Sequence, residues 1–268
     1  MTKPPLGLFA GGGDFPRQVL AALRQAGHEV CVVGFRGETD SRLLRAVPRS
    51  FCGTVGEYGK MIDFLRRAGV REALMAGYVR HTHIYRKPRA DSLTSRIFGS
   101  LLDRRADTLL AAAALRLKSA GITLVSAMPY LKHLVPDRGV LTKRVPTAGE
   151  WKDIEFGRRI AQRIAGLDIG QTVCVRDLAV VAVEALEGTD ACVLRAGGIA
   201  RSSLVVVKVA KPQQDFRFDV PVVGPKTVET LRRSRAGVMA IEAGRTILLD
   251  RPEVVRRADR AGISLVAV

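Results

Sequence analysis

The chain has 268 residues, of which 47% are hydrophobic and 26% are charged, and its formal net charge is +17 at pH 7. This composition is typical of a folded globular protein and excludes wholesale disorder, a collagen-like fibre and a coiled coil. No apolar stretch approaches the roughly 18 residues of a membrane-spanning helix, and the segment before the first strand-like run is too short for a secretory signal. The length fits one large domain or two small ones.

The basic excess comes from 43 Lys and Arg against 26 Asp and Glu. Such a charge attracts nucleic acid, an anionic membrane surface or a phosphorylated substrate. Arginines on solvated helix surfaces explain it equally well, so charge alone does not choose a partner. The four cysteines form no Cys-x-x-Cys pair and have no histidines at zinc-ligand spacing, which favours reduced thiols in a cytoplasmic protein.

Short, almost continuously apolar segments alternate with amphipathic ones in the first half of the chain. The pattern predicts strands over 6–10, 29–34, 72–77 and 122–126, and helices over 15–26, 58–68 and 100–119. Strands of this kind are typical of a parallel sheet covered on both faces. Ala-Gly pairs after helical segments predict glycine caps at Gly27, Gly69, Gly121, Gly237 and Gly262. We therefore expect a Rossmann-like parallel-sheet domain in the first half.

Turn residues cluster at 136–139 and predict a boundary between a first domain, 1–139, and a second, 140–268. The second half is more mixed. Its pattern predicts helices over 148–165 and 226–236, and strands over 172–175, 179–184, 204–209, 217–219, 238–241 and 263–268. The predicted fold class is thus α/β, with an N-terminal Rossmann-like domain and a C-terminal mixed α/β domain.

The first strand runs into a glycine-rich turn, Gly11-Gly12-Gly13-Asp14, and then into a helix. Asp14 suits the N-cap and Pro16 suits the first turn. Glycines here let the backbone approach a ligand, and the helix N-terminus offers N–H groups to a phosphate. The turn is neither GxGxxG nor a P-loop, and no acidic residue ends the second strand to hold an adenine ribose. A tight turn that needs glycine for steric reasons alone remains an alternative.

Two segments of the second half carry clustered charges. In the segment 184–190, Thr189 or Asp190 could cap the next helix, or the turn could hold carboxylates for a metal or amides for a phosphate. In the segment 208–221, Lys208, Lys211 and Arg217 could clamp phosphate oxygens around Asp219. A carboxylate among cations suits Mg²⁺ beside a diphosphate, or a water molecule that needs orienting. Surface ion pairs are the structural alternative.

Seven stretches, taken together and in order, resemble the UDP-2,3-diacylglucosamine pyrophosphatases of lipid A biosynthesis, of the two-domain type unrelated to metallophosphoesterases. They are GLFAGGGDFP at 7–16, GEYGK at 56–60, AGYV at 76–79, LDIGQ at 167–171, AVEALEGTD at 182–190, KVAKP at 208–212 and FDVP at 218–221. Each piece alone is weak, but the combination is specific and spans nearly the whole chain. One departure is Tyr78, where the family often has Asn.

The resemblance implies Mg²⁺-dependent hydrolysis of UDP-2,3-diacylglucosamine to 2,3-diacylglucosamine 1-phosphate (lipid X) and UMP, by water attack on the α-phosphorus. It also implies a substrate cleft between two domains, a homodimer, and work at the cytoplasmic face of the inner membrane. The family's essential aspartate corresponds to Asp219. From the charged turn at 184–190, Asp190 and Glu187 are our own candidates for further metal ligands. The expected substrate-binding residues are Gly11, Gly12, Gly13, Asp14, Ala76, Gly77, Gly188, Thr189, Lys208, Lys211 and Arg217.

Two other functions remain open from the residues alone. An oxidoreductase with a nucleotide cofactor would use the same glycine turn and would retain NAD(P) or flavin on purification. A non-enzymatic nucleic-acid-binding protein would use the charge of +17 and bind DNA or RNA with a steep salt dependence. The scarcity of aromatic residues, 5% of the chain, disfavours the second function because few side chains could stack on bases. No nucleic-acid partner is therefore expected.

Overall fold

The computed structural model describes residues 4–80, 90–99 and 106–268. The chain divides into two compact units. Unit 1 comprises Met1–Leu131 together with Phe216–Asp219, and unit 2 comprises Lys132–Asp215 and Val220–Val268. Four residues from late in the sequence thus belong to the unit built by the first half.

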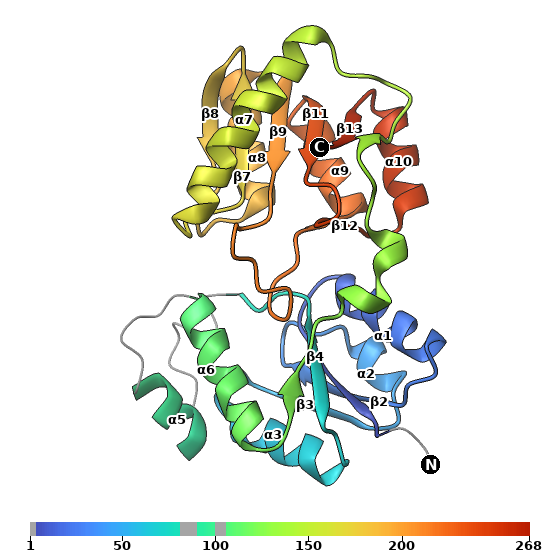
Figure 1. Cartoon of the computed structure of the whole chain (residues 1–268), viewed down its shortest axis with the longest axis vertical. Helices are drawn as coiled ribbons and strands as arrows, with labels where there is room; N and C mark the ends of the chain where they lie inside the picture. The colour runs from blue at the N-terminus through green and yellow to red at the C-terminus, as the bar shows by residue number, and fades with distance from the viewer. Residues whose placement is uncertain (1–3, 81–89, 100–105) are drawn as a thin grey trace. The chain divides into compact units, whose positions relative to one another are not determined.

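Unit 1 is built on a five-stranded, all-parallel sheet in the order β3-β2-β1-β4-β5 (Figure 1). The strands are β1 (Leu6–Ala10), β2 (Val30–Phe35), β3 (Ser50–Gly53), β4 (Glu72–Ala76) and β5 (Thr123–Leu124). The helices are α1 (Phe15–Gln25), α2 (Ser41–Arg45), α3 (Tyr58–Arg67), α5 (Ser92–Gly99) and α6 (Ala106–Ser119). This strand order confirms the Rossmann-like prediction. It places the topological switch point between β1 and β4, where open α/β sheets bind ligands.

Apolar side chains cover the sheet of unit 1. One core cluster joins Phe9, Cys31 and Val33 of the sheet to residues of α3 and α6, Met61 and Leu117 among them. In α1 the buried residues Val19, Leu20 and Leu23 recur at helical spacing, so this helix presents one apolar face. The strands β1 and β2 are buried along nearly their whole length, as their continuous apolar sequences predicted.

Unit 2 has a six-stranded mixed sheet in the order β6-β13-β11-β9-β7-β8. The strands are β6 (Gly139–Val140), β7 (Thr172–Arg176), β8 (Ala179–Val183), β9 (Leu204–Lys208), β11 (Ala236–Ile241) and β13 (Ser264–Ala267). β9, β11 and β13 run parallel, whereas β6, β7 and β8 pair antiparallel with their neighbours. β10 (Val222–Val223) and β12 (Ile247–Leu248) form a separate parallel pair. The helices are α7 (Ala148–Gly166), α8 (Thr189–Ala200), α9 (Pro225–Arg233) and α10 (Arg251–Arg260).

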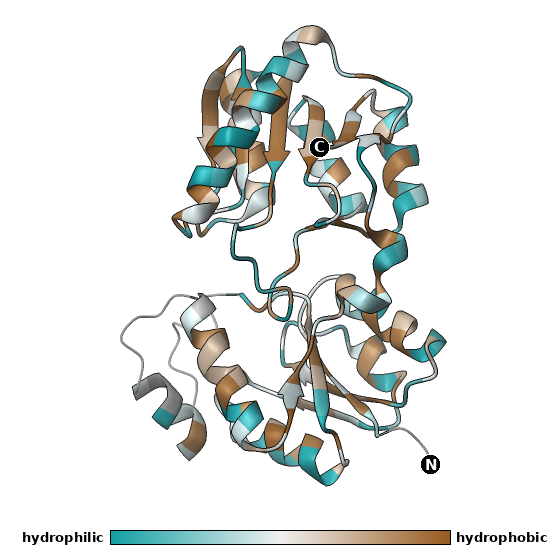
Figure 2. Cartoon of the chain, in the orientation of Figure 1, coloured by the Kyte–Doolittle hydropathy of each residue, from teal (hydrophilic) through white to brown (hydrophobic). Residues whose placement is uncertain are grey.

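Alternate residues of the unit 2 strands pack on opposite faces of the sheet. Val173, Val205, Val207 and Val238 join a cluster with α7. Cys174, Val206, Met239 and Leu265 join a second cluster with α8, α9 and α10. In Figure 2 these strands are largely brown, between helices that carry teal on their outer sides. A sheet that is buried on both faces explains why its strands read as apolar runs without alternation.

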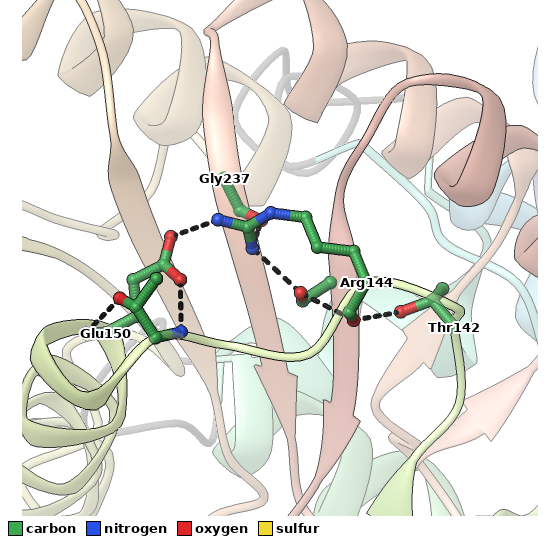
Figure 3. A network of polar contacts seen from close by, with 6 residues as sticks. Thr142, Arg144, Glu150 and Gly237 are labelled. Carbon is green, nitrogen blue, oxygen red and sulfur yellow. Dashed lines mark hydrogen bonds and ion pairs between the residues drawn. The ribbon is translucent and has the colours of Figure 1, made fainter.

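A polar network fixes the chain that leads into α7 against the beginnings of β11 and β13 (Figure 3). The Arg144 guanidinium donates to Gly237 O at 3.0 Å, Ser264 Oγ at 2.8 Å and Glu150 Oε1 at 2.7 Å. Glu150 also accepts from Thr147 N–H as part of a capping box. The network lies where β11 and β13 begin, whereas ligands in such sheets bind where parallel strands end. We therefore assign it to stability.

Several local predictions were wrong. Residues 217–219 do not form a strand: residues 216–218 form a turn, and Phe218 packs against the core of unit 1. Gly27, Gly69, Gly121 and Gly262 have positive φ as predicted, but after α9 it is Arg235, at φ 56°, that takes the left-handed conformation, while Gly237 lies inside β11. The short elements α2 and β3 were missed because their sequences carry little periodicity. The helix predicted over 100–119 is described from Ala106 onward.

Candidate substrate site

The glycine-rich turn lies at the switch point of unit 1, where β1 and β4 end side by side. Gly11 N–H donates to Ala76 O at 2.8 Å. Beyond this pair, Gly12 and Tyr78 form an antiparallel bridge, with Gly12 N–H to Tyr78 O at 2.7 Å and Tyr78 N–H to Gly12 O at 3.3 Å. The loops that follow β1 and β4 are therefore hydrogen-bonded to each other. This brings together two groups of predicted substrate-binding residues, Gly11–Gly13 and Ala76–Gly77.

This close approach explains the glycines on steric grounds. A Cβ on Gly11 would lie 2.5 Å from Tyr78 O, closer than real Cβ contacts. A Cβ on Gly77, whose φ is +85°, would overlap the carbonyl oxygen of Gly12. A Cβ on Gly12 would lie 2.9 Å from Cζ of the Tyr78 ring. The turn thus requires glycine at positions 11 and 77 even without a ligand, because backbone atoms block a Cβ there, whereas at position 12 the Tyr78 side chain can move aside. The half-exposed Tyr78 ring covers part of the turn.

The N-terminus of α1 differs in one respect from the prediction. Asp14 occupies the N-cap position, but its side chain bonds no helix amide. Instead, its carboxylate accepts from the Arg17 guanidinium at 3.2 Å, and both side chains are exposed. Pro16 stands in the first turn as predicted. The first-turn amides of α1 are therefore not occupied by the Asp14 side chain.

Sequence reasoning missed an acidic residue beside the glycine turn. Glu38 follows β2 by three residues, and its side chain is only 1% exposed. It accepts from Arg80 N–H at 3.0 Å, and a Cβ on Gly12 would lie 3.3 Å from its Oε2. The prediction that no acid holds a ribose rested on the end of β2 alone. The signal that could have found Glu38 is its place in the loop after the second strand, where Rossmann-like folds carry a ribose-binding acid.

The predicted catalytic residue, Asp219, belongs to unit 1. The preceding residues attach this segment to that unit: Ser126 Oγ donates to Phe216 O at 3.0 Å, and Phe218 packs against the cluster formed with α3 and α6. The Arg217 guanidinium lies 5.1 Å from the centre of the Phe218 ring, a cation–π contact. Asp219 itself is partly buried. An aromatic anchor next to the carboxylate thus fixes where the carboxylate lies in unit 1.

In unit 2, four polar side chains meet at the edge of the sheet where β9 ends. Lys208 Nζ donates to Thr189 Oγ1 at 2.7 Å, and Thr189 Oγ1 donates to Glu184 Oε1 at 2.9 Å. Thr172 Oγ1 lies 3.4 Å from Thr189 Oγ1. Thr189 begins α8, but the N-cap is Gly188, at φ 81°, so the alternative in which Thr189 or Asp190 caps this helix is wrong. The structure brings the predicted residues Lys208, Thr189 and Gly188 together, and it adds Glu184.

The remaining predicted carboxylates have separate surroundings. Glu187 binds the Arg195 guanidinium at 2.7 Å, and this hydrogen bond lowers the pKa of Glu187 below its ordinary value. Asp190 accepts from Thr230 Oγ1 at 3.1 Å and lies 3.4 Å from Lys226 Nζ. Within residues 4–80, 90–99 and 106–268, no three His, Cys, Asp or Glu side chains are grouped to hold a metal ion. Lys211 forms an ion pair with Asp168 at 2.5 Å.

Comparison with known proteins covers both units. A family model described as the LpxI N-terminal domain matches residues 5–134, and one described as the LpxI C-terminal domain matches residues 137–266. The chain is also 33% identical over 276 residues to a protein of Caulobacter vibrioides named UDP-2,3-diacylglucosamine pyrophosphatase LpxI. The alignment covers 98% of this chain and 97% of the relative.

The chain belongs to the LpxI family. The resemblance drawn from the seven sequence stretches is thereby confirmed. Asp219 lies within the match to the LpxI C-terminal domain, although the structure groups it with unit 1. As for membrane insertion, the helices of the described residues include none that combines the length and apolar character of a bilayer span.

Proposed function

We propose that this chain hydrolyses the diphosphate of UDP-2,3-diacylglucosamine. The oxygen of a water molecule bonds to the α-phosphorus, the bond from that phosphorus to the bridging oxygen breaks, and the products are UMP and 2,3-diacylglucosamine 1-phosphate. The water gives up one proton to a base. The observation that carries this proposal is similarity along the whole chain, 33% identity over 98% of its length, to a relative named for that activity.

The side chains of the candidate site suit this chemistry. Diphosphate hydrolysis needs cations that offset the charge of the attacked phosphate, and a carboxylate that orients water or holds a metal. Lys208, Lys211 and Arg217 supply the cations in the proposal, and Asp219 supplies the carboxylate. The glycine turn Gly11–Gly13 and the end of β4 are proposed to contact the nucleotide or the amino sugar.

Magnesium is part of the proposal and is assigned to Asp219. Mg²⁺ is commonly held by one or two carboxylates, with substrate phosphates and water as its other ligands, so a single aspartate fits such a site. Glu187 and Asp190, the other candidate ligands, each take part in an ion pair, with Arg195 and Lys226. When bound, the ion would neutralise phosphate charge and polarise the phosphorus–oxygen bond.

Hydrolysis in ¹⁸O-labelled water tests the reaction and the bond that breaks. The purified protein is incubated with UDP-2,3-diacylglucosamine in detergent, with Mg²⁺ or with EDTA, and the products are analysed by mass spectrometry. We expect UMP and the lipid phosphate only with Mg²⁺, with ¹⁸O in UMP. Intact substrate in every condition would refute the proposed function. Label in the lipid phosphate would refute attack at the α-phosphorus, and full activity in EDTA would refute the metal.

Peripheral binding to an anionic membrane is also part of the proposal, and a basic surface on unit 2 supports it. A hollow of about 600 Å³ beside α10 is lined by four basic residues and one acidic residue. A second hollow, of about 280 Å³, shares Arg260 with it and adds Arg232, Arg257 and the acidic Glu229. A hollow of about 440 Å³ in unit 1 has a more balanced lining of three basic and two acidic residues. Each basic residue near an anionic bilayer contributes about 1 kcal/mol.

Vesicle sedimentation tests this surface. We expect binding to phosphatidylglycerol vesicles and not to phosphatidylcholine vesicles, with a marked loss in the variant Arg251→Glu/Arg260→Glu. The matched control, Arg67→Glu/Arg71→Glu, makes the same charge change on exposed residues of unit 1. Equal loss in both variants would show that only net charge matters. The proposed homodimer is tested by light scattering during gel filtration.

A further inference from the structure

A chain of hydrogen bonds joins Glu184, Thr189 and Lys208 at the edge of the unit 2 sheet. We propose that Glu184 and Thr189 are positioning residues that hold the Lys208 ammonium group in place for a phosphate of the substrate. This inference rests on the proposed function, because it identifies how one part of that site binds the diphosphate. Glu184 was not among the residues that the sequence singled out for a role.

The topology of the sheet brings these residues together. Lys208 ends β9 and pairs in register with Thr172, which begins the antiparallel strand β7. Glu184 follows β8 directly, and its N–H donates to Thr172 O at 2.9 Å. Gly170 has to be a glycine because a Cβ there would overlap Glu184 O. After a short turn, Thr189 begins α8. The cluster is therefore set by strand pairing and not by a flexible loop.

Thr189 and Lys208 differ in the hydrogen-bond donors that they have left for a phosphate. The single hydroxyl proton of Thr189 is directed to Glu184 Oε1, since a carboxylate can only accept. The oxygen of Thr189 is then the acceptor for Lys208 Nζ. Thr189 has no proton left for a phosphate, whereas Lys208 keeps two of its three N–H donors. The Thr189 side chain can therefore act on a phosphate only indirectly, through Lys208.

Within the described part of the chain, the positive charge of Lys208 is not offset by a carboxylate in direct contact with it. Among the described residues Lys208 has no ion pair, and Glu184 reaches it only through the neutral hydroxyl. Lys211 contrasts with it, because its ammonium group is in direct contact with the Asp168 carboxylate at 2.5 Å. A lysine held by a hydroxyl keeps its orientation without losing its attraction for an anion, which suits a phosphate-binding group.

The second carboxylate oxygen, Glu184 Oε2, is buried and accepts no hydrogen bond from the described residues. Only Oε1 takes part in the chain that leads to Lys208. A glutamine can supply the same acceptor oxygen to Thr189, whereas leucine has a similar size and no acceptor. The pair Glu184→Gln and Glu184→Leu therefore separates the hydrogen bond from the packing.

Binding of UDP, measured by calorimetry, and steady-state kinetics with UDP-2,3-diacylglucosamine test the inference. We expect Thr189→Val and Glu184→Leu to weaken UDP binding and raise KM about tenfold, which corresponds to about 1.4 kcal/mol, with kcat little changed. Thr189→Ser and Glu184→Gln should remain within about twofold of the wild type. Thr246→Val is the matched control, because Thr246 is fully buried in unit 2 and its hydroxyl has no hydrogen-bond partner among the described residues.

A double variant provides the readout that a merely structural role would not move. If Thr189 acts through Lys208, then Thr189→Val should weaken UDP binding no further in a Lys208→Met background. Additive losses would overturn the inference, as would wild-type binding in Thr189→Val. If the wild type binds UDP and the two substitutions are non-additive, but the wild type leaves the lipid substrate intact, the proposed function is refuted and the inference is supported. If the wild type hydrolyses the lipid substrate and Thr189→Val changes neither UDP binding nor KM, the inference is refuted and the proposed function is supported.

Discussion

The steric account of the glycine turn predicts a large and localised loss of stability in Gly11→Ala. The added Cβ would lie 2.5 Å from Tyr78 O, 2.8 Å from Tyr78 N and 2.9 Å from Gly77 C, all backbone atoms that cannot turn away. Relief requires the two loops to separate. This separation weakens both hydrogen bonds of the Gly12–Tyr78 bridge.

The expected loss of stability combines weakened hydrogen bonds with overpacking. Two backbone hydrogen bonds contribute roughly 1 kcal/mol each, and overpacking costs roughly 1–3 kcal/mol. We therefore expect the free energy of unfolding of unit 1 to fall by about 3 kcal/mol. The comparison variant is Gly27→Ala, in the same unit. Gly27 has φ +78° but nothing within 4 Å of an added Cβ, so only the left-handed backbone is penalised, by roughly 1–2 kcal/mol.

Urea denaturation combined with peptide-resolved hydrogen exchange measures both variants. Exchange in β1 and β4 should accelerate much more in Gly11→Ala than in Gly27→Ala, while exchange in β9 and β11 of unit 2 stays as in the wild type. An equal loss in the two variants would refute the steric reasoning. The glycines would then have to be explained by the close approach of a ligand alone.

Three further predictions concern stability and reactivity. Burial opposes ionisation of Glu150, but hydrogen bonds from Arg144 and Thr147 outweigh it, so the pKa of Glu150 lies below its ordinary value. Its contribution to stability is therefore complete above the unfolded-state pKa of about 4.3 and is lost as the pH falls through the lower folded-state pKa. In Arg144→Met the pH dependence of unfolding below about pH 5 should shrink, and an unchanged profile would contradict the assignment. Thr246→Val removes a buried hydroxyl that has no partner in the part of the chain that the structure describes, so it should raise the free energy of unfolding by about 1 kcal/mol; a loss of that size in urea denaturation would contradict this. Finally, maleimide should label only Cys52 in the native protein, because the other three cysteines are buried and burial raises the pKa of the Cys31 thiol; fast labelling of a second thiol would contradict this.

The strands and long helices could be predicted because their sequences reflect burial directly. β1 and β11 are apolar throughout, and β9 is apolar up to its last residue, Lys208, since both faces of each sheet are covered; four of the five predicted glycine caps occur where Ala-Gly follows a helix. The strand predicted over 217–219 is wrong because a short alternation cannot distinguish a strand from an anchored turn, here at 216–218. What decides it is the contact of Phe218 with the core of unit 1, a long-range contact that no local pattern contains.

The candidate site was predictable by residue type but not by arrangement. Lys208 and Thr189 were identified from charge and turn chemistry, yet their bond depends on the antiparallel pairing of β7 with β9. Glu184 was passed over because it stands in a run of small and apolar residues with two other acids nearby. The glycines of the turn were interpreted chiefly as a phosphate cradle, and only the bridge to Tyr78 reveals their steric cause.

Turnover by Asp219→Asn is the measurement that tests the central claim most directly. The wild type, Asp219→Asn and the neighbouring control Asp215→Asn are compared on UDP-2,3-diacylglucosamine with Mg²⁺, and UDP binding is measured in all three. The account predicts that Asp219→Asn loses turnover by at least about a thousandfold while still binding UDP, and that Asp215→Asn keeps most of its activity. Near-normal hydrolysis by Asp219→Asn would contradict the assignment of this carboxylate to the reaction.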